Sequence, residues 1–299
     1  MLRNFDELLE LVKARPKKSV LGVVCAEDEH SIEAAMEGEK EGLVEAVLIG
    51  QEEVIKDLLA KLAPDWKGRI VHAESKEESS EKAVELVNAG EINALMKGSL
   101  DTSILLKAVV NKEKGLGTGR LMTHIALYEI PSYHKLLITT DGGMMMYPDL
   151  EQKKKIIENA VEVFHQLGYK QPKVACVGAV EKVNPKMPET VDAAELKEHF
   201  AGRDDLLVEG PISLDLSLSK EVAELKKYES PVAGDADIIL LPNITSGNIL
   251  GKSITILAKG EMAGIIYGAK APIILTSRGS SAEEKLNSIG LASLIELGD

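Results

Sequence analysis

The sequence predicts an α/β fold, in which a mostly parallel β-sheet carries helices on both faces. Short aliphatic runs alternate along the chain with longer segments of helical periodicity, which is the pattern of repeated β-α units. Apolar residues make up 44% of the chain and aromatic residues only 3%, so we expect an aliphatic core like that of buried parallel strands. The length of 299 residues leaves room for two domains around a shared cleft.

The first part of the chain reads as an amphipathic N-terminal helix followed by strand-helix pairs. The predicted strands are residues 20–26, 46–50, 69–73 and 94–97, and the helices that follow them are residues 31–41, 52–61, 77–88 and 102–110. The charged, glycine-rich residues 112–120 interrupt this pattern. We expect them to form an exposed connection between two domains.

The second part opens with two aliphatic runs that meet at Pro131, and we expect residues 121–130 and 135–140 to pair as adjacent strands. A long helix is expected to begin near Asp149, whose side chain is suited to cap it. The remaining predicted strands are residues 173–178, 206–209, 238–242, 263–268 and 272–276, and the remaining helices are residues 190–200, 215–226, 246–258 and 282–297.

Charge and cysteine content exclude several classes of protein. The net charge of −13 argues against non-specific binding to nucleic acid or to an anionic membrane. The N-terminal helix lacks the apolar region of a signal peptide, and no stretch has the roughly 18 apolar residues of a membrane span, so we expect a cytoplasmic protein. Cys25 and Cys176 lie in aliphatic strands and are expected to be buried free thiols. No histidine or cysteine spacing matches a metal site.

The segment richest in chemical groups follows the last predicted strand. Ser277, Arg278 and Gly279 stand at the carboxyl end of that strand, where open α/β sheets bind ligands. Arg278 is suited to hold phosphate in a bidentate fork, and Ser277 to donate a hydrogen bond to a developing oxyanion. Glu283 and Glu284 fall in the first turn of the next helix. Alternatively, these residues only cap and turn the helix.

Two other strand-to-helix turns carry small polar residues. The first contains Gly98 and Ser99, with Thr102 and Lys107 in the next helix; a glycine-serine turn before a helix suits phosphate. The second is formed by Asn243, Ser246, Gly247 and Asn248, whose amides and side chains either bind an anion or serve only as a cap. The Walker and dinucleotide-binding glycine patterns are both absent from the chain.

Aspartates also stand near strand ends. Asp141 follows the second strand of the expected pair and either points a carboxylate into the cleft or holds an ordinary turn. Asp235 and Asp237 precede another strand, where they either cap and turn the chain or imitate metal ligands.

Three stretches together resemble the phosphate acyltransferase family, the phosphate acetyl- and butyryltransferases. They are PVAGDADIILLPN through SGNILGK to PIILTSRGSS, MKGSLDTSILLKAV, and TTDGGMMMYPDLEQKKKIIENAV. The last stretch is most similar to the butyryl branch. The resemblance covers residues 90–299, whereas residues 1–90 agree with the family only as β-α units.

The resemblance implies reversible acyl transfer between coenzyme A, acting as a substrate, and inorganic phosphate, with no tightly bound cofactor or metal. It also implies two three-layer α/β domains of the isocitrate-dehydrogenase-like type with a cleft between them. The first would consist of residues 1–120 and 264–299, and the second of residues 121–263. A homodimer or larger homo-oligomer is implied as well.

The resemblance further implies roles for single residues. Ser277 would stabilise the tetrahedral intermediate, and Arg278 would hold phosphate. Glu284 stands where the acetyl branch has an aspartate that deprotonates the coenzyme A thiol, but the neighbouring Glu283 keeps the choice of base open. Lys107 lies near a family arginine that binds anions, with a gap of one residue. The three turns described above would bind the substrates.

Other functions stay open at this point. An acetyltransferase would differ from a butyryltransferase in the size of its acyl pocket, and one methylene changes specificity by only about 1–3 kcal/mol. A decarboxylating dehydrogenase on the same fold would need a nicotinamide site and metal-binding aspartates such as Asp235 and Asp237. A non-catalytic regulator that binds coenzyme A or phosphate would not need Ser277, Arg278 and a carboxylate together.

Overall fold

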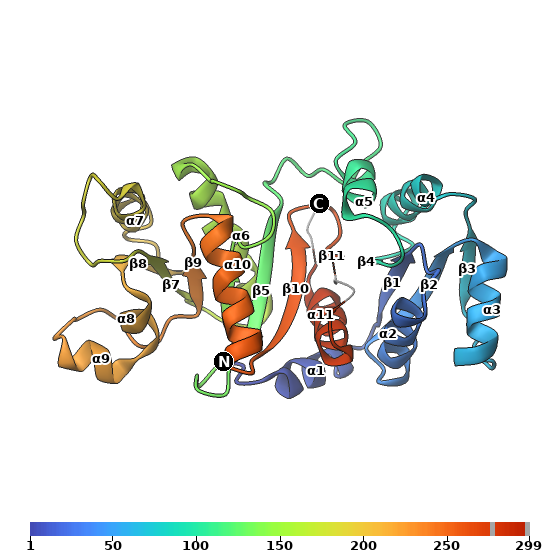
Figure 1. Cartoon of the computed structure of the whole chain (residues 1–299), viewed down its shortest axis with the longest axis horizontal. Coiled ribbons are helices and arrows are strands. Elements are labelled where there is room, and N and C mark those ends of the chain that lie inside the picture. Colours follow the sequence, from blue (N-terminus) through green and yellow to red (C-terminus); the bar gives the residue numbers. More distant parts are fainter. Residues whose placement is uncertain (276–278, 297–299) are drawn as a thin grey trace. The chain divides into compact units, whose positions relative to one another are not determined.

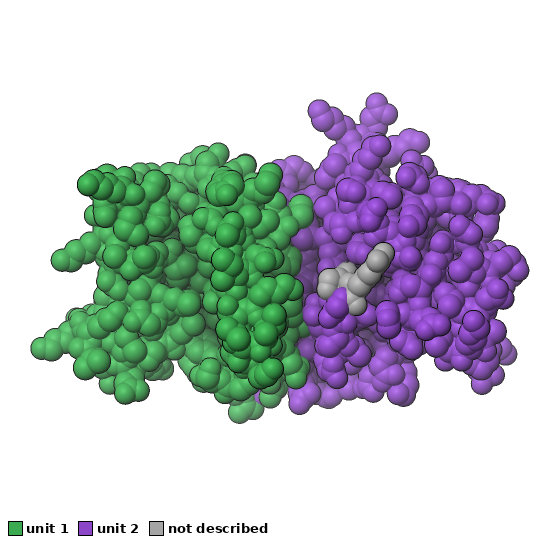
Figure 2. Space-filling model, in the orientation of Figure 1, with its two compact units in different colours: residues 1–4, 123–262 green, residues 5–122, 263–299 purple. Residues whose placement is uncertain are grey.

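The computed structural model describes residues 1–275 and 279–296 (Figure 1). The chain forms two compact units, which Figure 2 distinguishes by colour. Unit 1 consists of Met1–Asn4 and Thr123–Met262, and unit 2 of Phe5–Met122 and Ala263–Asp299. That the two units are separate domains with bounds near residues 120 and 264 stays a prediction.

Unit 2 is built on a sheet whose strands extend outward from β1 in both directions. The order is β3 (Arg69–His72), β2 (Val44–Gly50), β1 (Ser19–Val24), β4 (Ala94–Lys97), β11 (Ile273–Ile274) and the part of β10 (Glu261–Tyr267) from Ala263 onward. All neighbouring pairs are parallel except β10 and β11. The winding therefore reverses between β1 and β4, and open α/β sheets bind ligands beside such a reversal.

Helices cover both faces of the sheet in unit 2, so the predicted three layers are present there (Figure 1). One layer contains α1 (Phe5–Lys13), α2 (Glu29–Lys40), α3 (Glu52–Leu62) and α11 (Ala282–Leu294). The other contains α4 (Lys76–Asn88) and α5 (Thr102–Val109), which pack against each other. The buried side chains between the layers are mainly Leu, Ile, Val and Ala, as the composition predicts.

In unit 1 the strands lie in the order β5 (Thr123–Glu129), β6 (Leu137–Thr140), β9 (Ile238–Leu240), β7 (Lys173–Val177) and β8 (Leu207–Ile212). Only β5 and β6 are antiparallel, which confirms the predicted strand pair. The helices of this unit are α6 (Leu150–Gln166), α7 (Pro188–His199), α8 (Leu214–Leu218), α9 (Lys220–Leu225), α10 (Ile244–Lys252) and the π-helix η1 (Ser253–Leu257).

The helix boundaries in unit 1 confirm one prediction made from the sequence and contradict another. Asp149 caps α6 in a complete capping box with Gln152, as expected. The single helix predicted over residues 215–226 is wrong, because Ser219 is extended and accepts a hydrogen bond from the Val222 amide. The serine thereby ends α8 and caps α9.

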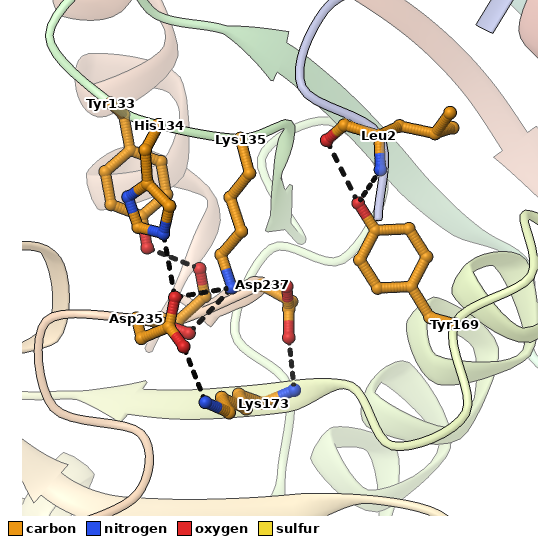
Figure 3. A network of polar contacts seen from close by, with 9 residues as sticks. Leu2, Tyr133, His134, Lys135, Tyr169, Lys173, Asp235 and Asp237 are labelled. Carbon is orange, nitrogen blue, oxygen red and sulfur yellow. Dashed lines mark hydrogen bonds and ion pairs between the residues drawn. The ribbon is translucent and has the colours of Figure 1, made fainter. Parts of the chain in front are cut away.

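A buried ion network joins the amino ends of three strands in unit 1 (Figure 3). The Lys135 ammonium is fully buried and lies 2.6 Å from an Asp237 carboxylate oxygen and 3.1 Å from one of Asp235. Lys173 pairs with Asp235 at 2.5 Å, and its backbone N–H donates to Asp237 at 2.8 Å. These contacts hold the starts of β6, β7 and β9 together, at the edge opposite their carboxyl ends.

No helix within residues 1–275 and 279–296 is long and apolar enough to cross a lipid bilayer.

Candidate functional site

Two segments that carry predicted site residues leave the sheet of unit 2 from neighbouring strands. β4 and β11 are parallel neighbours, with Ile274 beside Met96. The turn that leaves β4 and the segment that leaves β11 therefore begin at the same edge, as predicted for a ligand site. Ser277 and Arg278 belong to the second segment and lie outside the described residues.

The turn after β4 is packed against β1 through its backbone. The Gly98 amide donates to the Val24 carbonyl and the Ser99 amide to the Cys25 carbonyl, both at 2.8 Å. A Cβ atom at Gly98 would lie 2.2 Å from the Cys25 carbonyl oxygen, so the glycine is required by this close approach. The two amides are thus occupied. Ser99 is half-buried, and contact of its hydroxyl with a substrate stays a prediction.

The start of α5 lacks the side-chain cap that Asp101 could supply. Asp101 precedes the helix but makes no side-chain hydrogen bond to it, and Thr102 is exposed. Uncapped amides at a helix N-terminus attract anions. Lys107 lies further along α5 and lines a pocket of about 420 Å³ with Glu81 and Glu85 of α4. Neither Ser99 nor Thr102 lines this pocket, so a joint contact with phosphate stays a prediction.

The two glutamates at the start of α11 occupy different environments. Glu284 is half-buried, and the Ser280 hydroxyl donates to its Oε1 at 2.6 Å. Glu283 is exposed, and its own backbone N–H and the Ser281 hydroxyl hold its pKa below the usual value. Ser281 caps the helix by accepting from the Glu284 amide at 3.0 Å, as the capping interpretation predicts. Which of the two carboxylates acts as a base stays a prediction.

In unit 1 the turn before α10 uses most of its polar groups internally. The Asn243 side chain accepts from the Ser246 amide at 3.0 Å, and the Ser246 hydroxyl donates to the Asn243 carbonyl at 2.8 Å. Both residues therefore act as the helix cap. Asn248 is exposed on the next turn, and its contact with substrate stays a prediction.

Gly247 is required by a backbone contact with the turn after β6. A Cβ atom at this position would lie 2.6 Å from the Gly142 Cα and 2.9 Å from the Asp141 carbonyl oxygen. Both neighbours are backbone, so neither can rotate away. The two turns follow the parallel strands β6 and β9, where Thr140 lies beside Leu240.

Gly247→Ala is expected to lower the free energy of unfolding by about 1–3 kcal/mol, because the added methyl overpacks this contact. Urea denaturation followed by circular dichroism measures the loss. Gly178→Ala is the matched control in the same unit, since its nearest non-neighbouring atom would lie at 3.5 Å. Equal stability of the two variants would contradict the contact.

Asp141 holds its turn and does not project from it. Its carboxylate is buried and accepts from the amides of His124, Gly143 and Met144 at 2.9, 2.8 and 2.7 Å. The interpretation of Asp141 as an ordinary strand-end residue is the one that fits.

His124 was not singled out by the sequence, yet it lies beside Asp141. Its Nδ1 is buried and has no hydrogen-bond partner among the residues that the structure describes. Burial lowers the pKa of His124, although the nearby Asp141 charge opposes this. The expected strand pair could have predicted that His124 lies beside Asp141, because antiparallel pairing places the start of β5 beside the end of β6.

Because of the His124 imidazole, the free energy of unfolding is expected to fall as the pH is lowered below about 6.5. Its pKa in the folded chain lies below the ordinary value of 6.5, so the unfolded chain binds the proton first. The stabilising contribution is complete above about pH 6.5 and is lost as the pH falls towards the folded-state pKa. Urea midpoints of the wild type and of His124→Phe at pH 7.5 and 5.5 measure this. An equal drop in both proteins would contradict it.

Neither cysteine is placed as a nucleophile. Cys25 and Cys176 are both buried and free, and burial raises the pKa of each thiol. A protonated thiol attacks slowly.

Asp235 and Asp237 are occupied by the network of Figure 3. Burial opposes ionisation of Asp235, but hydrogen bonds from Lys173, His134 and Lys135 outweigh it and hold its pKa well below the usual value. In residues 1–275 and 279–296, no group of three or more His, Cys, Asp or Glu side chains is placed to hold a metal ion. Asp235 and Asp237 are therefore not free to act as the metal ligands that the dehydrogenase alternative would need.

Comparison with known proteins gives one consistent result. The family profile described as Phosphate acetyl/butaryl transferase matches residues 67–293. The chain belongs to this family. The phosphate butyryltransferase of Clostridium acetobutylicum is 40% identical over 299 residues, which are 99% of this chain and 99% of the relative. The phosphate acetyltransferase of Thermotoga maritima is 43% identical over 291 residues, 97% of this chain and 98% of the relative.

Solved structures agree with this family. A branched-chain phosphotransacylase from Enterococcus faecalis has a TM-score of 0.85 and 33% identity, covering 92% of this chain and 98% of its own. A 4-hydroxythreonine-4-phosphate dehydrogenase from Klebsiella pneumoniae has a TM-score of 0.56 at 14% identity, over 92% of this chain and 98% of its own. The second likeness shows the fold alone, and it accords with the predicted isocitrate-dehydrogenase-like class. The chain is thus a transferase enzyme with the predicted fold.

Proposed function

We propose that this transferase moves a short acyl group reversibly between coenzyme A and inorganic phosphate, converting butyryl-CoA and phosphate to butyryl phosphate and coenzyme A. The similarity over nearly the whole chain to a phosphate butyryltransferase supports the substrates. The observation in the structure that supports the chemistry is the half-buried Glu284 carboxylate, held by Ser280 at the start of α11, the helix that follows β11 in the chain. Coenzyme A is a substrate in this proposal, and no tightly bound cofactor takes part.

The reaction needs no covalent intermediate on the protein. In the direction of acyl-CoA synthesis, Glu284 takes the proton of the coenzyme A thiol. The thiolate sulfur attacks the carbonyl carbon of the acyl phosphate, and the carbonyl oxygen becomes an oxyanion to which Ser277 donates a hydrogen bond. The carbon–oxygen bond to phosphate then breaks, and Arg278 holds the departing phosphate. The reverse direction uses the same groups in the opposite order.

Arg278→Ala is expected to lower kcat/KM for phosphate by at least about tenfold, because the bidentate hold on phosphate is lost. Initial rates of thiol release at several phosphate concentrations measure this. Arg69→Ala is the matched control, because Arg69 is an exposed arginine of unit 2 paired with Glu91. An unchanged kcat/KM in Arg278→Ala would remove this residue from the site.

The acyl preference is tested by a panel of acyl-CoA thioesters. We expect kcat/KM to be higher for butyryl-CoA than for acetyl-CoA, with phosphate saturating. A preference for acetyl-CoA would replace the proposed butyryltransferase by an acetyltransferase, in line with the relative from Thermotoga maritima.

We also propose that the enzyme is a cytoplasmic homo-oligomer. Its two free cysteines suit a reducing compartment. Ile249, Ile256 and Leu257, on α10 and η1, are 62%, 60% and 78% exposed. Neighbouring exposed aliphatic side chains of this kind suit an interface between subunits. Light scattering on the purified protein measures its mass, and the mass of a single chain would contradict the proposal.

A further inference from the structure

Two successive serines before α11 have different tasks. The Ser281 hydroxyl accepts from the backbone N–H of Glu284 and so caps the helix. The Ser280 hydroxyl instead donates to the side chain of the same residue, 2.6 Å from Oε1. One serine therefore fixes the backbone of Glu284, and the other fixes its carboxylate.

The contact leaves the Glu284 carboxylate anchored at one oxygen. Oε2 has no hydrogen-bond partner among residues 1–275 and 279–296. A free glutamate side chain loses rotamer freedom when it is held in one position, and this loss of entropy opposes the reaction. The hydrogen bond from Ser280 holds the carboxylate in place before substrate binds. Part of this entropy loss has therefore already occurred before the reaction begins. Glu283, in the same turn, is exposed.

We propose that Ser280 is a positioning residue for acyl transfer, which aims Oε2 of Glu284 at the proton of the coenzyme A thiol. The inference rests on the proposed function, because it requires Glu284 to be the base. Ser280 touches neither substrate in this account and acts only through Glu284. Its effect therefore falls on the rate of the chemical step and not on substrate binding.

Ser280→Ala is expected to lower kcat about tenfold, with KM for butyryl-CoA and for phosphate changed less than about twofold. Ser280→Thr keeps a hydroxyl and is expected to restore kcat to within about threefold of the wild type. Ser293→Ala is the matched control, because Ser293 lies on the same helix and its hydroxyl donates to the Ile289 carbonyl of that helix. That control is expected to leave kcat unchanged.

A double-mutant cycle separates positioning from an independent role. If Ser280 acts only through Glu284, then Ser280→Ala combined with Glu284→Gln is no slower than Glu284→Gln alone. A further tenfold loss in the double variant would overturn the inference, as would an unchanged kcat in Ser280→Ala. Failure of the proposed function would look different, because the wild type itself would then release no thiol when phosphate is added.

Discussion

Glu284→Gln is expected to lower kcat for acyl transfer by about 10²–10⁴-fold, the usual contribution of a general base. Glutamine keeps the size of the side chain and still accepts the hydrogen bond from Ser280, but it cannot take the thiol proton. Thiol release from butyryl-CoA and thioester formation from butyryl phosphate measure both directions. Both are expected to slow by the same factor, because the equilibrium is unchanged.

Glu283→Gln is the matched control for this prediction. It changes the neighbouring residue in the same helical turn, at an exposed position. Its kcat is expected to stay within about threefold of the wild type, because the proposed mechanism gives the thiol proton to Glu284 and assigns no step to the exposed Glu283. If Glu283→Gln were the slower variant, the general base would be Glu283 and not Glu284.

Lys135→Met is expected to lower the free energy of unfolding by about 3–5 kcal/mol, the usual cost of removing one partner of a buried ion pair. The Lys135 side chain is fully buried, and its removal would leave the nearly buried Asp237 carboxylate without its cation. Urea denaturation at pH 7 measures the loss. Lys226→Met is the control in the same unit, because Lys226 is 45% exposed and pairs with Asp215 on the surface. Its change is expected to stay below about 1 kcal/mol.

A second variant and a change of pH test the same network. Adding Asp237→Asn to Lys135→Met is expected to recover part of the loss, because the uncompensated charge is gone. The folded-state pKa of Asp235 is lowered from 3.8 by its cationic neighbours. Its contribution to stability is therefore present above about pH 3.8 and is lost as the pH falls towards the folded-state value. A Lys135→Met protein as stable as the wild type would contradict the network.

The fold was readable from the sequence because its signals are local. Aliphatic runs that alternate with helical periodicity define β-α units, and Asp149 with Gln152 is a capping box visible in the letters alone. The break at Ser219 was missed because the helical pattern continues on both sides of it. Only the extended backbone of Ser219, set by tertiary packing, divides α8 from α9.

The site was less readable, because contacts across the sheet decide which groups are free. The sequence predicts that Gly98 and Gly247 bind substrate, whereas the atoms that approach them in the structure are the chain's own backbone at Cys25 and Gly142. The burial of Lys135 could not be predicted either, because charged residues are normally expected at the surface.

The choice between Glu283 and Glu284 was left open by spacing alone. The hydrogen bond from Ser280 to Glu284 supports our proposal that Glu284 is the base. That contact spans four positions across the helix start, so sequence spacing permits it without requiring it.

The most direct test of the account is the release of free thiol from butyryl-CoA by the purified protein, with and without inorganic phosphate, while hydroxylamine traps any acyl phosphate formed. The account predicts release that depends on phosphate, with one hydroxamate formed per thiol. Release that proceeds equally without phosphate, or no release with any short-chain acyl-CoA, would contradict it.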